Sequence, residues 1–596
     1  MATSNKDTPR CDNRDTSISI IQSYANLPSR QASATEKTEN AAQKKTIKFR
    51  AKLPKVRTGC QNCKIRRIKC DEAAPGCARC FKFGIPCSGY LKQSDKPKPR
   101  PIVPILPKEE EPRATRKSIV ELYIGPRFTD ELEARYFRYF CQNSAAEIAG
   151  PLPTGIWSEI IPQVCEIEPY IAHGLVALGA FIKHRKEITN GSVSSSTHQH
   201  REYALREYGK SLRGMQEAID KNTGRSPRTA LIACMLVFCI EGIQGHQASA
   251  TLHATNGILM MYDLYQANMA RCALGNQCAA GPELRRAFMD LDLQVLYCLD
   301  IRPTAHHVMI KEQLNQHLRG ELLPFQNITD CHEHLQAIMR RNLHFINVAR
   351  KSQLGLDFQE RYDKNFQPRD WEGAADLRQY NYPWSRVIHK VGFPPGLLYE
   401  RDTYLAEMIR WEEASKDIFQ QCMSSPPHSD AFRTAALLKA HAAASAIKLH
   451  GSFYTNDIGY DQLQPYFRTI ITNCALVHPY YSSSSYHTNL GILMPLFEVG
   501  LHCRDKILRD QAIAMSFVNK EYREGVWDSY VGGSICKWIR DLEEPWRDAD
   551  GFMPHDMRAK LAGLNVVAEK RMAQIFCTQR AAPGLGSVTK EIVITW

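Results

Sequence analysis

The stretch from Cys60 to Cys87 reads CQNCKIRRIKCDEAAPGCARCFKFGIPC, and it decides how the chain is organised. Its cysteine spacing is C-x2-C-x6-C-x6-C-x2-C-x6-C, which is two halves of the form C-x2-C-x6-C joined by one loop. Six thiolates are too many for one tetrahedral metal and too few for two independent four-cysteine sites. Two zinc ions that share two bridging sulfurs satisfy the count, and thiolate is a soft ligand that suits zinc. The six expected ligands are Cys60, Cys63, Cys70, Cys77, Cys80 and Cys87.

Two other interpretations of these cysteines compete with a zinc cluster. A disulfide framework is typical of small secreted domains, whereas this chain has 596 residues and opens with MATSNKDTPR, which lacks the apolar core of a signal peptide. Unliganded core cysteines would not be crowded within 28 residues among lysines and arginines. Paired CxxC units at regular spacing therefore favour zinc. The other fourteen cysteines form no CxxC pair, so we expect them to be buried reduced thiols.

The positive charge of the chain is concentrated around the same stretch. From Lys44 to Arg100 the sequence has seventeen Lys and Arg residues against three acidic residues, a net charge of +14. The whole chain carries +13, so the remainder is nearly neutral at −1. Two zinc ions bound by six thiolates subtract about two charges and leave the segment strongly basic. Such a block is the electrostatic footprint of a protein that binds a polyanion.

The cysteine stretch resembles the fungal six-cysteine zinc binuclear cluster, the DNA-binding domain of a large transcription factor family. All six cysteines match the pattern of that family, and Pro75 lies where the family places a proline in the loop between the halves. The resemblance implies two Zn²⁺ ions bridged by the sulfurs of Cys60 and Cys77. It also implies that Cys63 and Cys70 complete one site, and that Cys80 and Cys87 complete the other.

Four of the six residues between the second and third cysteines are basic, in the segment Lys64–Lys69 (KIRRIK). Ile65 and Ile68 are three residues apart, so we expect them to share one face of a short helix, pack inward and turn the cations outward. The resemblance implies that this helix enters the major groove and reads a CGG-like triplet. We expect Arg66 and Arg67 to contact bases, because arginine binds guanine O6 and N7 bidentately, for roughly 1–3 kcal/mol of discrimination.

The remaining basic residues are expected to contact the DNA backbone. The second half of the stretch is less basic and more apolar, so we interpret it as a scaffold that packs on the first half. The expected backbone contacts are Lys64, Lys69, Arg79 and Lys82 in the cluster and Lys55 and Arg57 in the basic segment before it.

The composition predicts five successive segments. Residues 1–43 are polar and are expected to be disordered, because they bury too little surface to offset chain entropy. Residues 44–57 form a basic arm suited to phosphate contact and nuclear import, and residues 58–90 form the zinc cluster domain. Residues 91–127 form a linker whose six prolines before Ser118 would break a coiled coil. Residues 128–596 are expected to form a large all-α regulatory region.

Helical periodicity recurs through the regulatory region, and short breaks between helices predict antiparallel helical hairpins. No strand alternation is long enough to indicate a sheet, and the apolar run from Ala230 to Ile240 is too short to span a membrane. The order of these helices resembles, diffusely, the region that follows the cluster in many factors of the family. The expected helices are 130–140, 170–184, 201–219, 229–243, 252–265, 404–421, 430–450, 466–477, 491–507 and 556–575.

The regulatory region shows no motif of catalysis. It has no phosphate loop, nucleophile elbow or zincin spacing. Three histidine pairs invite a metal interpretation, but no acid or cysteine completes a ligand pattern, so exposed or loop histidines are favoured. The pairs are His198 and His200, His306 and His307, and His332 and His334.

Together these features predict a nuclear, sequence-specific DNA-binding transcription regulator of RNA polymerase II genes, with two Zn²⁺ ions and no enzymatic activity. Its expected partners are double-stranded DNA and the transcription machinery or co-regulators, not a membrane. Self-association through the helical region stays open. The alternative function is a helical protein-interaction scaffold whose zinc cluster does not read DNA.

Overall fold

The structure is a computed structural model that describes residues 58–90, 128–150, 155–191, 195–220, 226–272, 281–298, 300, 302–320, 322–353, 393–454, 457–482, 484–517, 521–567 and 570–596. The described residues fall into two compact units, 58–90 and those from 128 onward, and each is considered by itself. The predicted disordered segment 1–43, the basic arm 44–57 and the linker 91–127 lie outside the described residues.

The small unit contains two five-residue helices, α2 (Gln61–Ile65) and α3 (Ala78–Lys82), which pack against each other. Its buried interior is made of cysteine side chains, of which five are no more than 4% exposed. The most exposed large apolar residue of the unit is Phe81, at 88%. A unit of this size with an interior of thiols has too little apolar burial to hold itself together, so metal ligation has to supply its stability.

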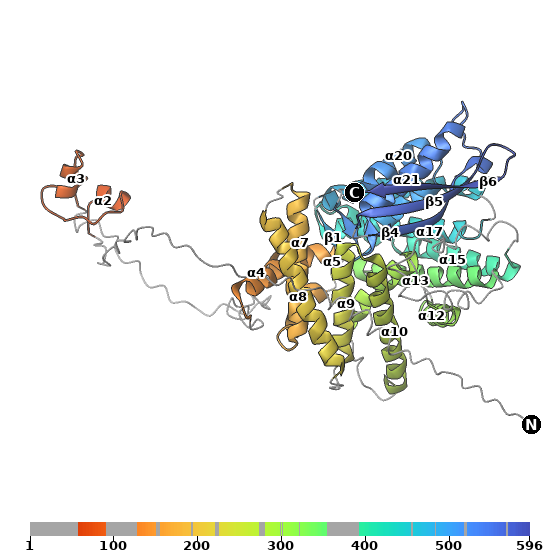
Figure 1. Cartoon of the computed structure of the whole chain (residues 1–596), viewed down its shortest axis with the longest axis horizontal. Coiled ribbons are helices and arrows are strands. Elements are labelled where there is room, and N and C mark those ends of the chain that lie inside the picture. The colour runs from red at the N-terminus through yellow and green to blue at the C-terminus, as the bar shows by residue number, and fades with distance from the viewer. Residues whose placement is uncertain are drawn as a thin grey trace, which may run out of the picture. The chain divides into compact units, whose positions relative to one another are not determined.

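The large unit is mainly helical, as expected (Figure 1). Short π-helical turns join its first elements at η3 (Phe140–Ser144) and η4 (Ile156–Ile160). Its helices in the first part are α4 (Glu131–Tyr139), α5 (Ala145–Ala149), α6 (Ile161–Val164), α7 (Pro169–Thr189), α8 (Ser195–Asp220), α9 (Pro227–Gln244), α10 (Gln247–Cys272), α11 (Pro282–Cys298), α12 (Thr304–His317) and α13 (Ile328–Gln353).

The second part of the large unit adds further helices and short 3-10 turns at η7 (Asp457–Leu463), η8 (Glu544–Trp546) and η9 (His555–Met557). Consecutive helices pack as hairpins in the pairs α7 and α8, α9 and α10, and α12 and α13, and also in the pair α17 (Asp430–Gly451) and α18 (Gln464–Ser482). This confirms the prediction of helical hairpins. The helices of this part are α15 (Pro395–Ala414), α16 (Lys416–Met423), α17 (Asp430–Gly451), α18 (Gln464–Ser482), α19 (Leu493–His502), α20 (Lys506–Ser516) and α21 (Ser529–Glu543).

Helix α9 shows how the local sequence sets the ends of an element. The Ser226 hydroxyl accepts a hydrogen bond from the Arg228 backbone N–H at the start, and Pro227 occupies the first helical position. Gly245 ends the helix in a left-handed conformation with φ 89°. The helix is long and apolar enough to cross a membrane, but 61% of its apolar window is buried and it packs against α7 and α10. It is therefore packed as a core helix, as the short apolar run predicted.

Several predicted boundaries are wrong. The expected helix 404–421 is two helices that meet at Ser415, and 491–507 is likewise split, because the Asp505 carboxylate caps a new helix at the Leu508 N–H. The expected helix 466–477 is longer than predicted, because α18 continues through Ser482 with Pro479 inside the helix. Helices α11, α12, α13 and α21 were not anticipated from periodicity.

The expected helix 556–575 is also wrong, because the chain ends in an antiparallel sheet of order β4-β5-β6. Its strands are β4 (Lys560–Val567), β5 (Met572–Arg580) and β6 (Ser587–Thr595). Strand β5 buries alternate residues, so Ala573, Ile575 and Cys577 form a small core with Val531 and Ile535 of α21. This period-2 burial is the strand signal that the helical interpretation overlooked. A second small sheet joins β1 (Tyr486–His487), β2 (Arg523–Glu524) and β3 (Trp527–Asp528).

A buried ion network ties α11 to α13. The Asp292 carboxylate is fully buried and lies 2.7 Å from the Arg302 guanidinium and 2.8 Å from the Arg340 guanidinium. Burial alone would raise the pKa of Asp292, but the two guanidinium groups hold it well below its ordinary value. A carboxyl with a lowered pKa stabilises the folded state above its unfolded pKa, and this contribution is lost as the pH falls.

We expect Asp292→Asn to lower the free energy of unfolding by about 3–5 kcal/mol, because the buried Arg340 guanidinium loses its counter-charge and the buried Arg302 guanidinium keeps only Asp300. The matched control is Asp402→Asn, since Asp402 is 61% exposed and pairs with Arg401 at 2.7 Å. The control should change stability by less than about 1 kcal/mol. Urea unfolding of the full chain measures both, and equal midpoints for the two variants would contradict the role of the network.

Candidate zinc and nucleic-acid site

The six cysteines form two groups of four that share two members. The sulfurs of Cys60, Cys63, Cys70 and Cys77 lie within 4.8 Å of one another, and so do those of Cys60, Cys77, Cys80 and Cys87. This is the arrangement in which six sulfurs give each of two ions four ligands, with the shared pair as bridges. The residues therefore fit two zinc ions, which would supply structural ligation and no chemistry of their own.

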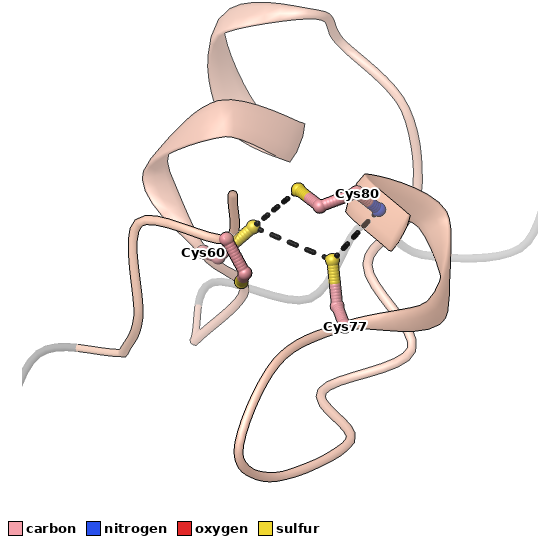
Figure 2. A group of neighbouring side chains, drawn as sticks. Cys60, Cys77 and Cys80 are labelled. Atoms are coloured by element: carbon pink, nitrogen blue, oxygen red, sulfur yellow. Dashed lines mark hydrogen bonds between the residues drawn. The ribbon is translucent and has the colours of Figure 1, made fainter. Parts of the chain in front are cut away.

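The distances between the sulfurs test this fit. The Cys60 sulfur lies 3.7 Å from both the Cys77 and the Cys80 sulfur (Figure 2). The Cys63 sulfur lies 3.6 Å from that of Cys77. With a Zn–S bond of about 2.3 Å, neighbouring corners of a tetrahedron lie about 3.8 Å apart. A disulfide would need about 2.0 Å. All six thiols are free, so the disulfide alternative is excluded for this stretch.

The backbone places the sulfurs by repeating one local structure. Cys60 and Cys77 are the N-cap residues of α2 and α3, and the Cys77 sulfur accepts a hydrogen bond from the Cys80 backbone N–H at 3.3 Å. A β-carbon at Gly59 would lie 2.7 Å from the Cys70 β-carbon, so only glycine lets the chain pass this close to the cluster.

The thiols differ in how readily they release the proton that a metal must displace. Burial raises the pKa of Cys63 to about 12 and raises the pKa of Cys77 as well. A hydrogen bond from the Cys77 backbone lowers the pKa of Cys87 to about 7. For Cys70, burial acts to raise the pKa, but hydrogen bonds led by the Cys60 backbone outweigh it and bring it to about 7. Because zinc binds thiolates, acid should weaken its binding.

Polar contacts join the two halves beside the sulfurs. The Asn62 amide donates to the Pro86 carbonyl at 2.9 Å, and its backbone N–H donates to the Ser88 hydroxyl at 3.1 Å. The Asp71 carboxylate accepts the Ala78 N–H at 3.0 Å at the start of α3. Once metal ions bind the sulfurs, these contacts set the orientation of α2 relative to α3.

The basic residues between the second and third cysteines do not lie on one helix as expected. Helix α2 ends at Ile65, and Arg67 adopts a left-handed conformation with φ 54°. Ile65 is 72% exposed and Ile68 is 40% exposed, so the prediction that they pack inward is wrong. The sulfurs, not the isoleucines, form the interior. Lys64, Arg67 and Lys69 are exposed nonetheless.

The second half contacts the first half, as predicted, but its two exposed rings do not form an interior. Phe81 is 88% exposed and Phe83 is 61% exposed, so neither ring is buried. Phe83 contacts Arg66 instead, with the guanidinium carbon 3.5 Å from the ring centroid. Arg79 and Lys82 lie on α3 and are exposed. The role of Phe83 was missed, although it follows Cys80 by three residues as Arg66 follows Cys63.

Comparison with known proteins agrees with this geometry. Residues 58–97 match the family described as the fungal Zn(2)-Cys(6) binuclear cluster domain. The chain carries a Zn(2)-Cys(6) domain. The match covers all six cysteines and both helices, so the predicted resemblance of the stretch and its two zinc ions are confirmed. No solved structure matches the chain.

Several curated relatives are similar to longer parts of the chain. The aspercryptin biosynthesis cluster-specific transcription regulator atnN of Emericella nidulans is 28% identical over 227 residues, which is 34% of this chain and 34% of the relative. The transcription regulator lscL of Purpureocillium lilacinum is 24% identical, over 34% of this chain and 48% of the relative. The Zn(2)-C6 fungal-type transcription factor afumD of Aspergillus fumigatus is 30% identical, over 21% of this chain and 32% of the relative. The chain thus spans less than half the length of each of these relatives.

The histidine pairs were expected to be exposed or in loops, and of them His198 is exposed. All three pairs lie in helices, and His200 and His307 are buried. None of them belongs to a group of three or more ligands among the described residues. A further group outside the Zn(2)-Cys(6) domain joins Glu133, His173 and Glu207. Lys210 lies 3.3 Å and 2.8 Å from its two carboxylates and offsets one of their two negative charges.

The basic arm contributes nothing that can be located, because Lys55 and Arg57 lie outside the described residues. Within the Zn(2)-Cys(6) domain, the predicted contacts Lys64, Lys69, Arg79 and Lys82 are exposed around the helix ends. Because these four side chains are exposed, they are available to bind a polyanion. Their contacts with the DNA backbone stay predictions.

We expect Cys77→Ala to remove a sulfur from both groups and to leave the full chain with less than one bound zinc. Cys63→Ala removes a sulfur from one group only and should retain about one zinc. The matched control is Cys141→Ala, an exposed cysteine outside the domain, which should retain two. Native mass spectrometry counts the ions, and two zinc ions in Cys77→Ala would contradict the shared-sulfur geometry.

Proposed function

We propose that the chain is a nuclear, sequence-specific DNA-binding transcription regulator of RNA polymerase II genes. The observation that carries this proposal is the coincidence of a zinc-organised module with exposed Lys and Arg side chains beside its sulfurs. The names of the relatives support it, since each one cited above is a transcription regulator or transcription factor. The same names favour a regulator over an enzyme.

The affinity for DNA would come first from charge. Lys64, Lys69, Arg79 and Lys82 would neutralise phosphates, together with Lys55 and Arg57 of the basic segment. Each phosphate contact releases counterions, so binding should weaken steeply as salt rises. These contacts orient the module on the duplex without reading its sequence.

The reading of sequence would fall to Arg66 and Arg67, which follow α2 directly. Arg67 is held left-handed at φ 54°, and the equivalent residue of the second half is Gly84, at φ 74°. An L residue is strained in this conformation by roughly 1–2 kcal/mol, whereas glycine is not. Strain retained at one of two equivalent positions points to a function for the side chain. We assign Arg67 to the guanine contact of a CGG-like triplet.

The helical region would carry regulation through the transcription machinery or co-regulators. Its hairpins and C-terminal sheet offer a large surface outside the Zn(2)-Cys(6) domain. Homodimerisation through this region is part of the proposal and would set the spacing of two triplets on DNA.

The deciding experiment is selection of random duplex DNA by the full chain, with two zinc ions bound and again after chelation. Zinc-dependent enrichment of a CGG-like triplet supports the proposal, and two triplets at a fixed spacing support a dimer. Failure to enrich any sequence with zinc fully bound would overturn the proposal and favour a protein-interaction scaffold.

We expect Arg67→Gly to keep both zinc ions, because glycine already occupies the equivalent position of the second half. Loss of the guanidinium should weaken binding to the selected duplex by about 5- to 150-fold, the range of one bidentate base contact. Binding to an unrelated duplex should fall much less. Fluorescence anisotropy measures both affinities.

The matched control for this variant is Arg79→Ala, which removes an exposed cation from α3. As a phosphate contact, Arg79 should weaken binding to the two duplexes equally and reduce the salt dependence. If Arg67→Gly also weakens both duplexes equally, Arg67 does not read bases.

A further inference from the structure

The two halves of the Zn(2)-Cys(6) domain repeat with an offset of 17 residues, from α2 at 61–65 to α3 at 78–82. Arg66 follows the first helix and Phe83 follows the second, so the two residues occupy equivalent positions. Their backbones are alike, with φ −78° and ψ 0° for Arg66 and φ −94° and ψ −1° for Phe83. The side chains meet across the repeat, since the guanidinium carbon lies 3.5 Å from the ring centroid.

This contact is a cation–π interaction, because a guanidinium within about 6 Å of a ring centroid is attracted to the electrons of its face. Phe83 is 61% exposed, so burial of the ring does not account for its place in the domain. Arg66 is partly buried, in contrast to Lys64, Arg67 and Lys69 beside it. Its Nη1 atom is buried and has no hydrogen-bond partner among the described residues. Among the residues that the structure describes, the guanidinium is held by the ring, and no ion pair with an acidic side chain is present.

A cation held in advance loses less conformational freedom when it binds a ligand. We propose that Phe83 is a positioning residue for DNA recognition, which holds the Arg66 guanidinium in place before DNA binds. This inference rests on the proposed function. It assigns Phe83 to the orientation of Arg66 and not to direct contact with DNA. The contribution of Arg66 to binding then depends on an aromatic side chain from the other half of the domain.

Phe81 provides a matched control two residues away. It lies on the same short segment and is more exposed than Phe83, at 88% against 61%. It makes no ring contact with a cation among the described residues. A general loss of exposed apolar surface would affect Phe81→Ala and Phe83→Ala alike, whereas loss of the cation–π contact affects only Phe83.

The test measures binding of the zinc-loaded full chain to the selected duplex by fluorescence anisotropy, with the zinc content of each variant counted. Phe83→Leu keeps an apolar side chain and removes the ring, and it should weaken binding by about 3- to 30-fold, the range of one cation–π contact. Phe83→Tyr keeps the ring face and should bind as the parent chain does. Phe81→Ala should also bind as the parent chain does.

A double-mutant cycle links the effect to Arg66. Once Arg66→Ala is present, Phe83→Leu should have almost no further effect, because no guanidinium remains to be held. Parent-like binding by Phe83→Leu, weakened binding by Phe83→Tyr, or additive losses in the cycle would each overturn the positioning role. If Phe83→Leu loses zinc, the same cycle is measured with Phe83→Met, which also removes the ring and keeps an apolar side chain.

The two proposals fail in different ways. A zinc-loaded parent chain that enriches no DNA sequence overturns the proposed function and this inference with it. A parent chain that binds its selected duplex, together with a zinc-loaded Phe83→Leu variant of equal affinity, overturns this inference alone.

Discussion

The sharing of two sulfurs between two tetrahedral groups is the constraint on which the small unit depends. Cys60 and Cys77 belong to both groups, so neither half can form its metal site without the other. The interior of the unit is made of thiols, and the large apolar side chains Ile65 and Phe81 face outward. Ligation therefore replaces the hydrophobic core as the source of order. Ligation of the sulfurs also sets the positions of the basic side chains.

The large unit is held together by different physics. Helical hairpins bury a continuous apolar core, and ion networks such as the one around Asp292 satisfy the charges that this core encloses. At the C-terminus a three-stranded sheet covers α21 with the alternate residues of β5. In the small unit a few ligands specify the fold, whereas in the large unit many weak contacts share that role.

Prediction from sequence succeeded where the chemistry of a few residue types was decisive. Cysteine spacing and the count of tetrahedral ligands identified the zinc cluster. Helical periodicity located the starts of α4 and α9 to within two residues, where Asp130 and Ser226 are the N-caps. Prediction failed where packing decides between local alternatives. The three-residue spacing of Ile65 and Ile68 predicted two buried side chains, but sulfur atoms already fill the interior of the unit. The period-2 pattern of β5 was too short to be recognised without α21 to pack against.

The sequence by itself determined the metal, the number of ions, the location of positive charge and the mainly helical class, because each follows from residue type and spacing along the chain. Only the tertiary structure decided which side chains meet across the repeat. The Arg66 guanidinium contacts the Phe83 ring, and the next residue, Arg67, adopts a left-handed conformation. The chain after η9 forms strands and not a helix. These features depend on the distance between segments in space, and sequence spacing does not encode that distance until the sulfurs and the core bring the segments together.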